Sequence, residues 1–279
     1  MTHPFLPAEP QAEHHSELID VAHELADAAA AAILPFFRSA DLLSDNKAAA
    51  GYDPVTQADR ASESAMRAIL AAKRPADGVL GEEFGAAPGT SSLTWVLDPI
   101  DGTRAFLCGA PSWGVLIAVA DRDGCPLYGL IDQPWTGERF EGGLGRASAR
   151  SPHGVRHLAV RRGRSLAEAT LMTTYPEIGS PAESEAFRRV SARARLTRYG
   201  MDCYAYALLA LGQVDLVIEA GLQAYDIAAP MAVIEAAGGI VTDWSGGPAW
   251  HGGQVIAAAT PELHRQAMAL LAGDEIVAG

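Results

Sequence analysis

The segment WVLDPIDGTRAF, residues 95–106, constrains the fold of this chain most strongly, because two aspartates directly follow an apolar run. The apolar run predicts a buried strand. Two carboxylates at the end of a buried strand are costly unless a positive group lies between them. Asp98 and Asp101 can converge on one point together with the backbone carbonyl oxygen of Ile100. Such an all-oxygen site suits a hard divalent cation such as Mg²⁺.

The next two residues, Gly102 and Thr103, predict a phosphate site beside these carboxylates. They would lie at the start of a helix, where backbone N–H groups without a helical partner favour an anion. An isolated Asp-Gly pair is more typical of a turn. Here a strand precedes the pair and a helix start follows it, which favours the functional interpretation.

Two further acidic segments could complete the site. In GEEF, residues 81–84, Glu82 or Glu83 could project into the same space from a strand end, and the alternative is a solvated turn pair. Asp226 begins an apolar helix, and its alternative is a helix N-cap. An N-cap geometry would also let the carboxylate face a metal, so the two interpretations of Asp226 overlap.

The charge of the chain limits its partners. Its 279 residues carry a formal net charge of −13, which disfavours binding to nucleic acid or to an anionic membrane. An anionic substrate would then need local positive charge, which metal ions would supply. The three cysteines form no CxxC pair, which favours a reducing cytoplasm. No apolar run reaches membrane-spanning length, and the N-terminus does not resemble a secretory signal.

The first half predicts two helices packed on an antiparallel sheet. Apolar residues recur at helical spacing over 17–39, with Ser16 as the expected N-cap after a frayed start, and again over 59–74. Short strand-like runs dominate from about Gly78 to Arg150, which indicates an antiparallel meander.

The second half alternates strand-like and helix-like segments in an α/β manner. We therefore expect a mixed α+β and α/β fold that forms a single structural unit. The N-terminal half, residues 1–150, would carry most of the metal ligands. The C-terminal half, residues 151–279, would supply the substrate pocket and the last metal ligand.

The segments GEE, WVLDPIDGT and YDIAA…EAAGG together resemble the inositol monophosphatase-like superfamily of Mg²⁺-dependent, lithium-sensitive phosphatases. The resemblance implies a layered αβαβα sandwich of the inositol monophosphatase and fructose-1,6-bisphosphatase type. It also implies two or three Mg²⁺ or Mn²⁺ ions per site, a small phosphate ester as substrate, and a homodimer. The implied metal ligands are Glu82, Asp98, the Ile100 carbonyl, Asp101 and Asp226.

The same resemblance implies the catalytic roles. Thr103 and Asp59 would orient the attacking water, and Glu82 would also reach a third ion. The backbone amides of Gly102 and Thr103 would hold the phosphate. Lys47 matches a lysine on a loop near the metals, and the further candidates beside the site are Glu83 and Arg104.

Within the superfamily, the chain resembles the histidinol-phosphate phosphatases of bacteria and plants. Ala105 stands where inositol-hydrolysing enzymes usually have Asn, and Tyr225 stands where they tend to have Trp. Asp202 and Glu219 would match the ammonium and imidazole groups of histidinol. Their alternatives are a helix N-cap and a solvated strand end. The expected substrate contacts are Asp101, Asp202, Glu219 and Arg198.

The expected function is hydrolysis of L-histidinol phosphate in histidine biosynthesis, in the cytoplasm, by attack of a metal-activated water. One alternative is an inositol-1-monophosphatase, or another small sugar or nucleotide phosphate phosphatase of the same superfamily. An alternative of another class is a non-catalytic regulatory protein with the same fold. The complete set of acidic residues argues against this regulatory protein, because buried carboxylates that hold no metal would reduce its stability.

Overall fold

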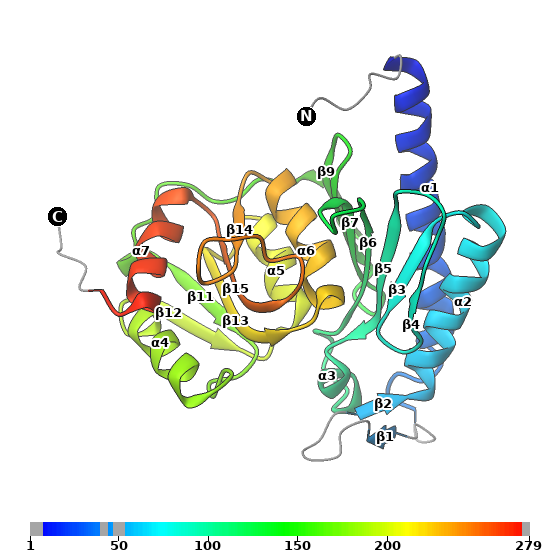
Figure 1. Cartoon of the computed structure of the whole chain (residues 1–279). Helices are drawn as coiled ribbons and strands as arrows, with labels where there is room; N and C mark the ends of the chain where they lie inside the picture. Colours follow the sequence, from blue (N-terminus) through cyan, green and yellow to red (C-terminus); the bar gives the residue numbers. More distant parts are fainter. Residues whose placement is uncertain (1–7, 40–43, 47–53, 275–279) are drawn as a thin grey trace.

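The computed structural model describes residues 8–39, 44–46 and 54–274. Helices and two large sheets alternate in five layers, which confirms the predicted αβαβα sandwich (Figure 1). The first outer layer holds α1 (Ala8–Ile33) and α2 (Gln57–Lys73), the central layer α5 (Cys203–Ala210) and α6 (Ala224–Ala236), and the last layer α4 (Pro181–Ser191) and α7 (Pro261–Ala272).

An eight-stranded sheet, ordered β10-β9-β8-β7-β6-β5-β3-β4, forms the second layer. From β5 to β10 all neighbours are antiparallel, as the predicted meander requires, whereas β3 runs parallel to β5. The sheet continues to His157, past the expected boundary of the two halves at residue 150. Its strands are β3 (Gly78–Gly81), β4 (Gly85–Ala87), β5 (Thr94–Asp101), β6 (Gly114–Ala120), β7 (Pro126–Gln133), β8 (Glu138–Gly143), β9 (Arg146–Ser151) and β10 (Gly154–His157).

A five-stranded sheet, ordered β12-β11-β13-β15-β14, forms the fourth layer. The pairs of β11 with β12 and β13 are parallel, whereas β15 is antiparallel to both of its neighbours. Strand β15 and the following α7 are not among the elements predicted from the sequence. The strands of this sheet are β11 (Thr170–Thr173), β12 (Leu196–Tyr199), β13 (Leu216–Leu222), β14 (Ile240–Thr242) and β15 (Gly253–Ala258).

Strand β5 is apolar on both faces because helices cover both faces of its sheet. Trp95 and Leu97 pack in the core shared with α1 and α2, and Val96 packs in the core that includes α6. Successive side chains of a strand point to opposite faces, so burial of both faces requires a continuous apolar run. The strand ends at Asp101, so its two aspartates lie at the end of a strand buried on both faces.

The first helix differs from the prediction at both ends. It begins at Ala8, so Ser16 lies inside α1 and is not its N-cap, and residues 8–15 are helical rather than frayed. It ends at Ile33 because Pro35 disfavours helical geometry at the residue before it. No helix in the described part of the chain is long and apolar enough to cross a membrane.

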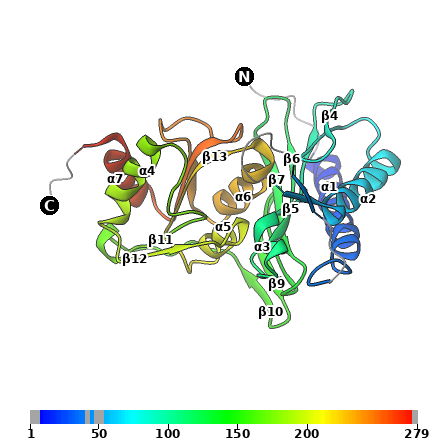
Figure 2. The same ribbon diagram turned by 90° about the horizontal axis from the view of Figure 1, so that it is seen from below.

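Short elements complete the region where the layers meet. The five-residue helix α3 (Thr103–Leu107) follows β5 and contacts β2 (Pro54–Thr56), which pairs with β1 (Ser44–Asn46). Seen from below, α3 lies at the edge of the first sheet, beside the central helices (Figure 2). The end of β5 therefore meets α6 and α3 at one place in the fold.

Candidate active site

Two groups of carboxylates lie at the end of β5. The first consists of Asp98, Asp101 and Asp226, and one oxygen from each lies within 4.8 Å of the others. The second consists of Asp59, Glu82 and Glu83 and meets the same distance limit. A hydrogen bond between Glu82 and Asp98 joins the two groups. The structure thus brings together acidic residues that are up to 167 positions apart in the sequence, from Asp59 to Asp226 (226 − 59).

An irregularity in β5 places Asp98 and Asp101 on the same side. Residues three apart in a regular strand face opposite sides. The register between β5 and β6 shifts between Asp98 and Asp101, and Pro99, which has no N–H to donate, lies within the shift. The Ile100 N–H donates to Asp98 Oδ1 at 3.1 Å, and the Cys203 N–H donates to Asp101 Oδ2 at 2.6 Å. The backbone thereby holds both carboxylates.

The third aspartate of the first group comes from the start of α6. Asp226 is the third residue of this helix, and its Oδ2 accepts the Gln223 N–H at 2.6 Å in a capping box. The N-cap of α6 is therefore Gln223 rather than Asp226, which is the N3 residue of the capping box, and the Asp226 carboxylate also lies close to Asp98 and Asp101.

A buried glutamate of α2 shapes the turn that carries Glu82. Glu63 accepts the Glu83 N–H at 2.7 Å, and the Arg67 Nε–H donates to it at 2.7 Å. A Cβ atom at Gly81 would lie 2.0 Å from a carboxylate oxygen of Glu63. The absence of a side chain at residue 81 therefore lets this turn approach α2 closely.

Asp59 is fixed at the first turn of α2. The Thr56 N–H and hydroxyl donate to Asp59 Oδ2 at 2.8 and 2.5 Å. The other oxygen, Oδ1, is buried and has no hydrogen-bond partner among the described residues. Helix α3, which begins with Thr103, contacts the strand directly before this turn. The Thr103 hydroxyl donates to the Ile100 carbonyl oxygen at 3.2 Å.

Burial and crowding raise the pKa values of these carboxyl groups. For Asp98 and Asp101, burial acts first and neighbouring carboxylates second, and both pKa values lie well above the usual range. Burial raises the pKa of Asp59 to about 6, against the opposing effect of its bonds from Thr56. A divalent cation among the oxygens would favour the ionised forms. The hard oxygen donors and the unpartnered Asp59 oxygen therefore fit bound metal ions.

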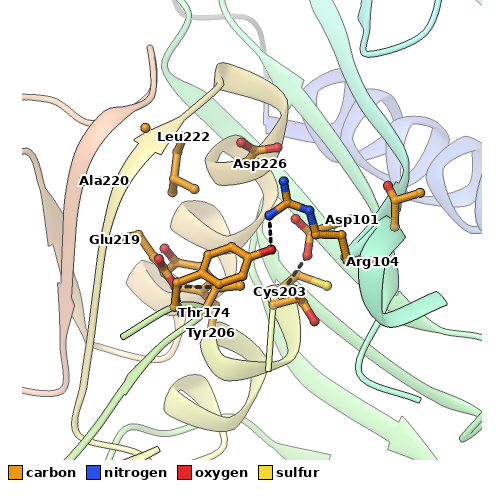
Figure 3. A pocket seen from close by; sticks show the side chains of 14 residues that line it. Asp101, Arg104, Thr174, Cys203, Tyr206, Glu219, Ala220, Leu222 and Asp226 are labelled. Atoms are coloured by element: carbon orange, nitrogen blue, oxygen red, sulfur yellow. Dashed lines mark hydrogen bonds between the residues drawn. The ribbon is translucent and has the colours of Figure 1, made fainter. Parts of the chain in front are cut away.

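A pocket of about 280 Å³ adjoins the first group and extends toward the five-stranded sheet. Figure 3 shows its side chains, with Asp101 and Asp226 on one side and Glu219 on the other. Gly102 also lines it, with a φ of 81°, and a Cβ atom there would lie 2.8 Å from the Asp202 carboxylate carbon. Glycine at this position thus permits both the left-handed backbone and the close approach of Asp202.

Asp202 does not cap the helix that follows it. Its side chain makes no capping bond to α5, and its φ is 48°. The first N–H of α5, from Cys203, instead donates to Asp101. The Asp202 carboxylate accepts a hydrogen bond from the Ser112 hydroxyl at 3.0 Å and lines the pocket. Burial raises the pKa of Asp202, and Ser112 and then Arg104 oppose this effect.

Glu219 is buried, so the alternative of a solvated strand end is wrong. Its carboxylate accepts bonds from the Thr173 hydroxyl at 3.0 Å and from the Thr174 N–H at 2.6 Å. Burial raises its pKa to about 7, although these bonds favour the ionised form. The pocket therefore contains a second pair of carboxylates, Asp202 and Glu219, apart from those at the end of β5.

Of the three remaining basic candidates for the site, one is found at the pocket. Arg104 lines the pocket. Arg198 lies on β12 with an exposed side chain and is not among the residues that line this pocket, so the structure does not support it as a substrate contact. Lys47 lies outside the described residues.

The residues that hold the acidic groups in place are not among those predicted from the sequence. Glu63 gives a signal, because a charged residue on the apolar face of a predicted helix, four residues before Arg67, indicates a buried ion pair. Ser112 and Thr174 give none, because their partners Asp202 and Glu219 are 90 and 45 residues away along the chain.

Comparison with known proteins agrees with this geometry. The inositol monophosphatase family model matches residues 14–274. The chain is 40% identical over 259 residues to the chloroplastic bifunctional phosphatase IMPL2 of Arabidopsis thaliana, covering 89% of this chain and 73% of that protein. It is 37% identical over 247 residues to a histidinol-phosphatase of Mycobacterium tuberculosis, covering 87% and 93%.

Among solved structures, an inositol monophosphatase from Zymomonas mobilis superposes with a TM-score of 0.82 at 41% identity, covering 92% of this chain and 98% of that one. The family match spans nearly all the described residues and includes every carboxylate of the two acidic groups. The chain is therefore an enzyme and belongs to the inositol monophosphatase family of metal-dependent phosphatases.

Proposed function

We propose that this phosphatase hydrolyses L-histidinol phosphate to L-histidinol and phosphate. The observation that carries the proposal is the second pair of carboxylates, Asp202 and Glu219, in the pocket beside the acidic groups. Histidinol carries an ammonium group and an imidazole, so its charge complements these carboxylates. The similarity to a histidinol-phosphatase of Mycobacterium tuberculosis supports the same substrate.

The acidic groups would hold two or three Mg²⁺ ions. Their proposed ligands are Glu82, Asp98, the Ile100 carbonyl, Asp101 and Asp226, and the closeness of the carboxylates at the end of β5 supports this set. When bound, such ions lower the pKa of a coordinated water and stabilise the charge of the phosphate group. Mn²⁺ would satisfy the same oxygen donors.

Residues beside the proposed metal ligands would place the water and the phosphate. Asp59 has an unpartnered carboxylate oxygen that can accept a hydrogen bond from a water molecule. The hydroxyl of Thr103 can turn from the Ile100 carbonyl to the same water. The N–H groups of Gly102 and Thr103 would donate to the phosphate oxygens, because they lie at the start of α3 and lack helical acceptors.

The alcohol part of the substrate would lie toward the five-stranded sheet. Glu219, on β13, lines that side of the pocket and is held by hydrogen bonds from Thr173 and Thr174. Asp202, which is held by Ser112, lines the pocket beside Gly102. An ammonium group between Asp202 and Glu219 would lower both pKa values and stabilise the ionised carboxylates. An uncharged ring alcohol would bring no positive charge to these carboxylates, which favours the cationic substrate.

A second candidate is an inositol monophosphate or another small sugar phosphate. The observation in its favour is the 41% identity to the inositol monophosphatase from Zymomonas mobilis, which is close to the identity with the bifunctional phosphatase of Arabidopsis thaliana. Both substrates would use the same acidic groups. They differ in what Asp202 and Glu219 contribute.

Phosphate release from a panel of esters, assayed with saturating Mg²⁺, tests the proposal. The panel contains L-histidinol phosphate, inositol 1-phosphate, fructose 1,6-bisphosphate and 3′-phosphoadenosine 5′-phosphate. We expect the highest kcat/KM for L-histidinol phosphate. A higher value for inositol 1-phosphate would support the second candidate, and the lowest value for L-histidinol phosphate would contradict the first. The homodimer and the cytoplasmic location stay predictions, which sedimentation and fractionation would test.

A further inference from the structure

A cation–aromatic contact lies in the pocket. Arg104 comes from α3, and Tyr175 follows β11, so the contact bridges the two halves of the molecule. The guanidinium carbon of Arg104 lies 5.2 Å from the centre of the Tyr175 ring, and its N–H donates to the Tyr175 hydroxyl. Both residues line the pocket, and Figure 3 shows the Arg104 side chain extending into it.

Arg104 is a positive side chain in a pocket whose other charged lining residues are negative. The residues that line the pocket include the four carboxylates Asp101, Asp202, Glu219 and Asp226, and among these lining residues Arg104 is the single Lys or Arg. Its charge favours the ionised form of Asp202 and opposes the effect of burial. The guanidinium thus lies beside a tyrosine ring, whose hydroxyl accepts its N–H, in a pocket that Asp202 also lines. Aromatic rings and carboxylates are the groups that bind organic cations in proteins.

Tyr175 has no evident part in the hydrophobic core. Its side chain is 42% exposed, and it directly follows Thr174, whose N–H and hydroxyl hold Glu219. The chain therefore places a ring beside both carboxylates of the pocket. A large aromatic side chain that is half exposed in a binding pocket is suited to contact a ligand.

We propose that Tyr175 and Asp202 form the subsite for the planar, cationic part of the substrate, and that Arg104 occupies this subsite when no substrate is bound. The proposal rests on the proposed function. A guanidinium and an imidazolium are both planar, delocalised cations, so the position of Arg104 beside the Tyr175 ring, in a pocket that Asp202 also lines, indicates which chemical group the subsite accepts. The substrate must displace Arg104 from the ring, which makes Arg104 a tethered competitor of the substrate.

Inhibition by the two products tests the aromatic part of the subsite. L-Histidinol probes the alcohol side of the pocket, and inorganic phosphate probes the phosphate side. In Tyr175→Leu we expect the inhibition constant of L-histidinol to rise about tenfold, within the range of cation–aromatic contacts, while that of phosphate stays the same. Tyr175→Phe keeps the ring and should bind L-histidinol nearly as the unmodified enzyme does. Tyr199→Leu removes another half-exposed tyrosine that does not line the pocket and is the matched control.

The proposed role of Arg104 predicts a change of the inhibition constant in the opposite direction. Arg104→Met removes the charge and keeps a long side chain, so L-histidinol no longer competes with a tethered cation. We expect its inhibition constant to fall several-fold. A constant that is unchanged or higher in Arg104→Met would show that Arg104 does not occupy the subsite.

The outcomes separate this inference from the proposed function. Hydrolysis of L-histidinol phosphate by the unmodified enzyme tests the function alone. If that ester is hydrolysed and Tyr175→Leu leaves the inhibition constant of L-histidinol unchanged, the subsite is wrong and the function stands. If the unmodified enzyme neither hydrolyses the ester nor is inhibited by L-histidinol, both fail.

Discussion

The two sets of carboxylates in this site are held in different ways. At the end of β5, backbone groups fix the acids: the Ile100 N–H holds Asp98, and the Cys203 N–H holds Asp101. For the second pair, Asp202 and Glu219, hydroxyl groups from distant segments contribute, namely Ser112 to Asp202 and Thr173 to Glu219, beside the Thr174 N–H that Glu219 also accepts. Backbone contacts persist when neighbouring side chains change, whereas side-chain contacts can be exchanged one at a time. The first arrangement suits a reaction shared by a family, and the second suits a choice of substrate.

The pKa values of the two sets also respond to different neighbouring groups. The acids at the end of β5 raise one another's pKa values, so that set is suited to ligands of concentrated positive charge. Around Glu219, bonds from Thr173 and Thr174 oppose the effect of burial, and its pKa is about 7. A single positive charge on an organic ligand is enough to ionise such a group near neutral pH.

The strongest test of this contrast is Asp98→Asn. Because Asp98 lies in the first acidic group and contacts Glu82, the loss of its charge should weaken metal binding and reduce kcat by about 10³-fold or more. A thermal melt with and without Mg²⁺ gives a second measurement. The unmodified enzyme should melt at a higher temperature with Mg²⁺, and Asp98→Asn should show little of this increase.

Asp121→Asn is the control for this change. Asp121 accepts backbone N–H groups in the turn between β6 and β7, and asparagine can keep these bonds. Its kcat and its response to Mg²⁺ should match those of the unmodified enzyme. Near-normal kcat in Asp98→Asn would overturn the metal site proposed at the end of β5.

For Glu219→Gln we expect a smaller effect, which is a change in the pH dependence of KM. The pKa of Glu219 is about 7, so the carboxylate becomes ionised as the pH rises from about 6 to 8. The KM of a cationic ester should fall over this range in the unmodified enzyme and change less in the variant. The KM values of the unmodified enzyme and of Glu219→Gln should differ about tenfold at about pH 8 and little at about pH 6.

As the pH rises, the unmodified enzyme should bind the cationic ester more tightly but lose stability, because both effects depend on ionisation of Glu219. The folded pKa lies above the ordinary value of 4.5, so the folded protein binds more protons than the unfolded chain between these two values. This contribution to stability is lost as the pH rises through about 7. The variant should therefore gain melting temperature relative to the unmodified enzyme on going to higher pH. Glu235→Gln, on α6 outside the pocket, is the control, and equal KM profiles for the three proteins would contradict the role of Glu219.

The same contrast explains how far the sequence could predict the site. Asp98 and Asp101 lie in one segment whose apolar run and Asp-Gly-Thr are visible without a structure. Their convergence, however, needs a shift of register around Pro99, which follows from pairing with β6. The hydroxyl that holds Asp202 lies 90 residues away, and only the fold brings Ser112 to it. A short-range pattern therefore identified Asp98 and Asp101, and the family resemblance added Asp202 and Glu219, whereas the residues that orient these acids depend on tertiary contacts.

The fold shows a similar limit. Local sequence patterns predicted β3, β5, β6, β7, β8 and the two helices packed on them, and the layered sandwich and the family are confirmed. Strand β4 has the sequence Gly-Ala-Ala and is exposed, so it carries no apolar alternation. Helix α1 extends to Ala8 through residues that read as polar and proline-containing. Such segments adopt regular structure without the apolar pattern by which sequence analysis recognises it.

The smallest effect, and the sharpest test of the comparison, is Ser112→Ala. Its hydroxyl donates to Asp202 at 3.0 Å, so the variant removes one bond that orients the carboxylate. A single hydrogen bond of this kind should raise the KM of L-histidinol phosphate about threefold, with kcat unchanged. Ser148→Ala loses a similar bond, from its hydroxyl to Glu141 at 2.7 Å, outside the pocket. Both variants should lose similar stability, but only Ser112→Ala should change KM. Equal KM values would mean that Ser112 stabilises the fold without acting on the substrate.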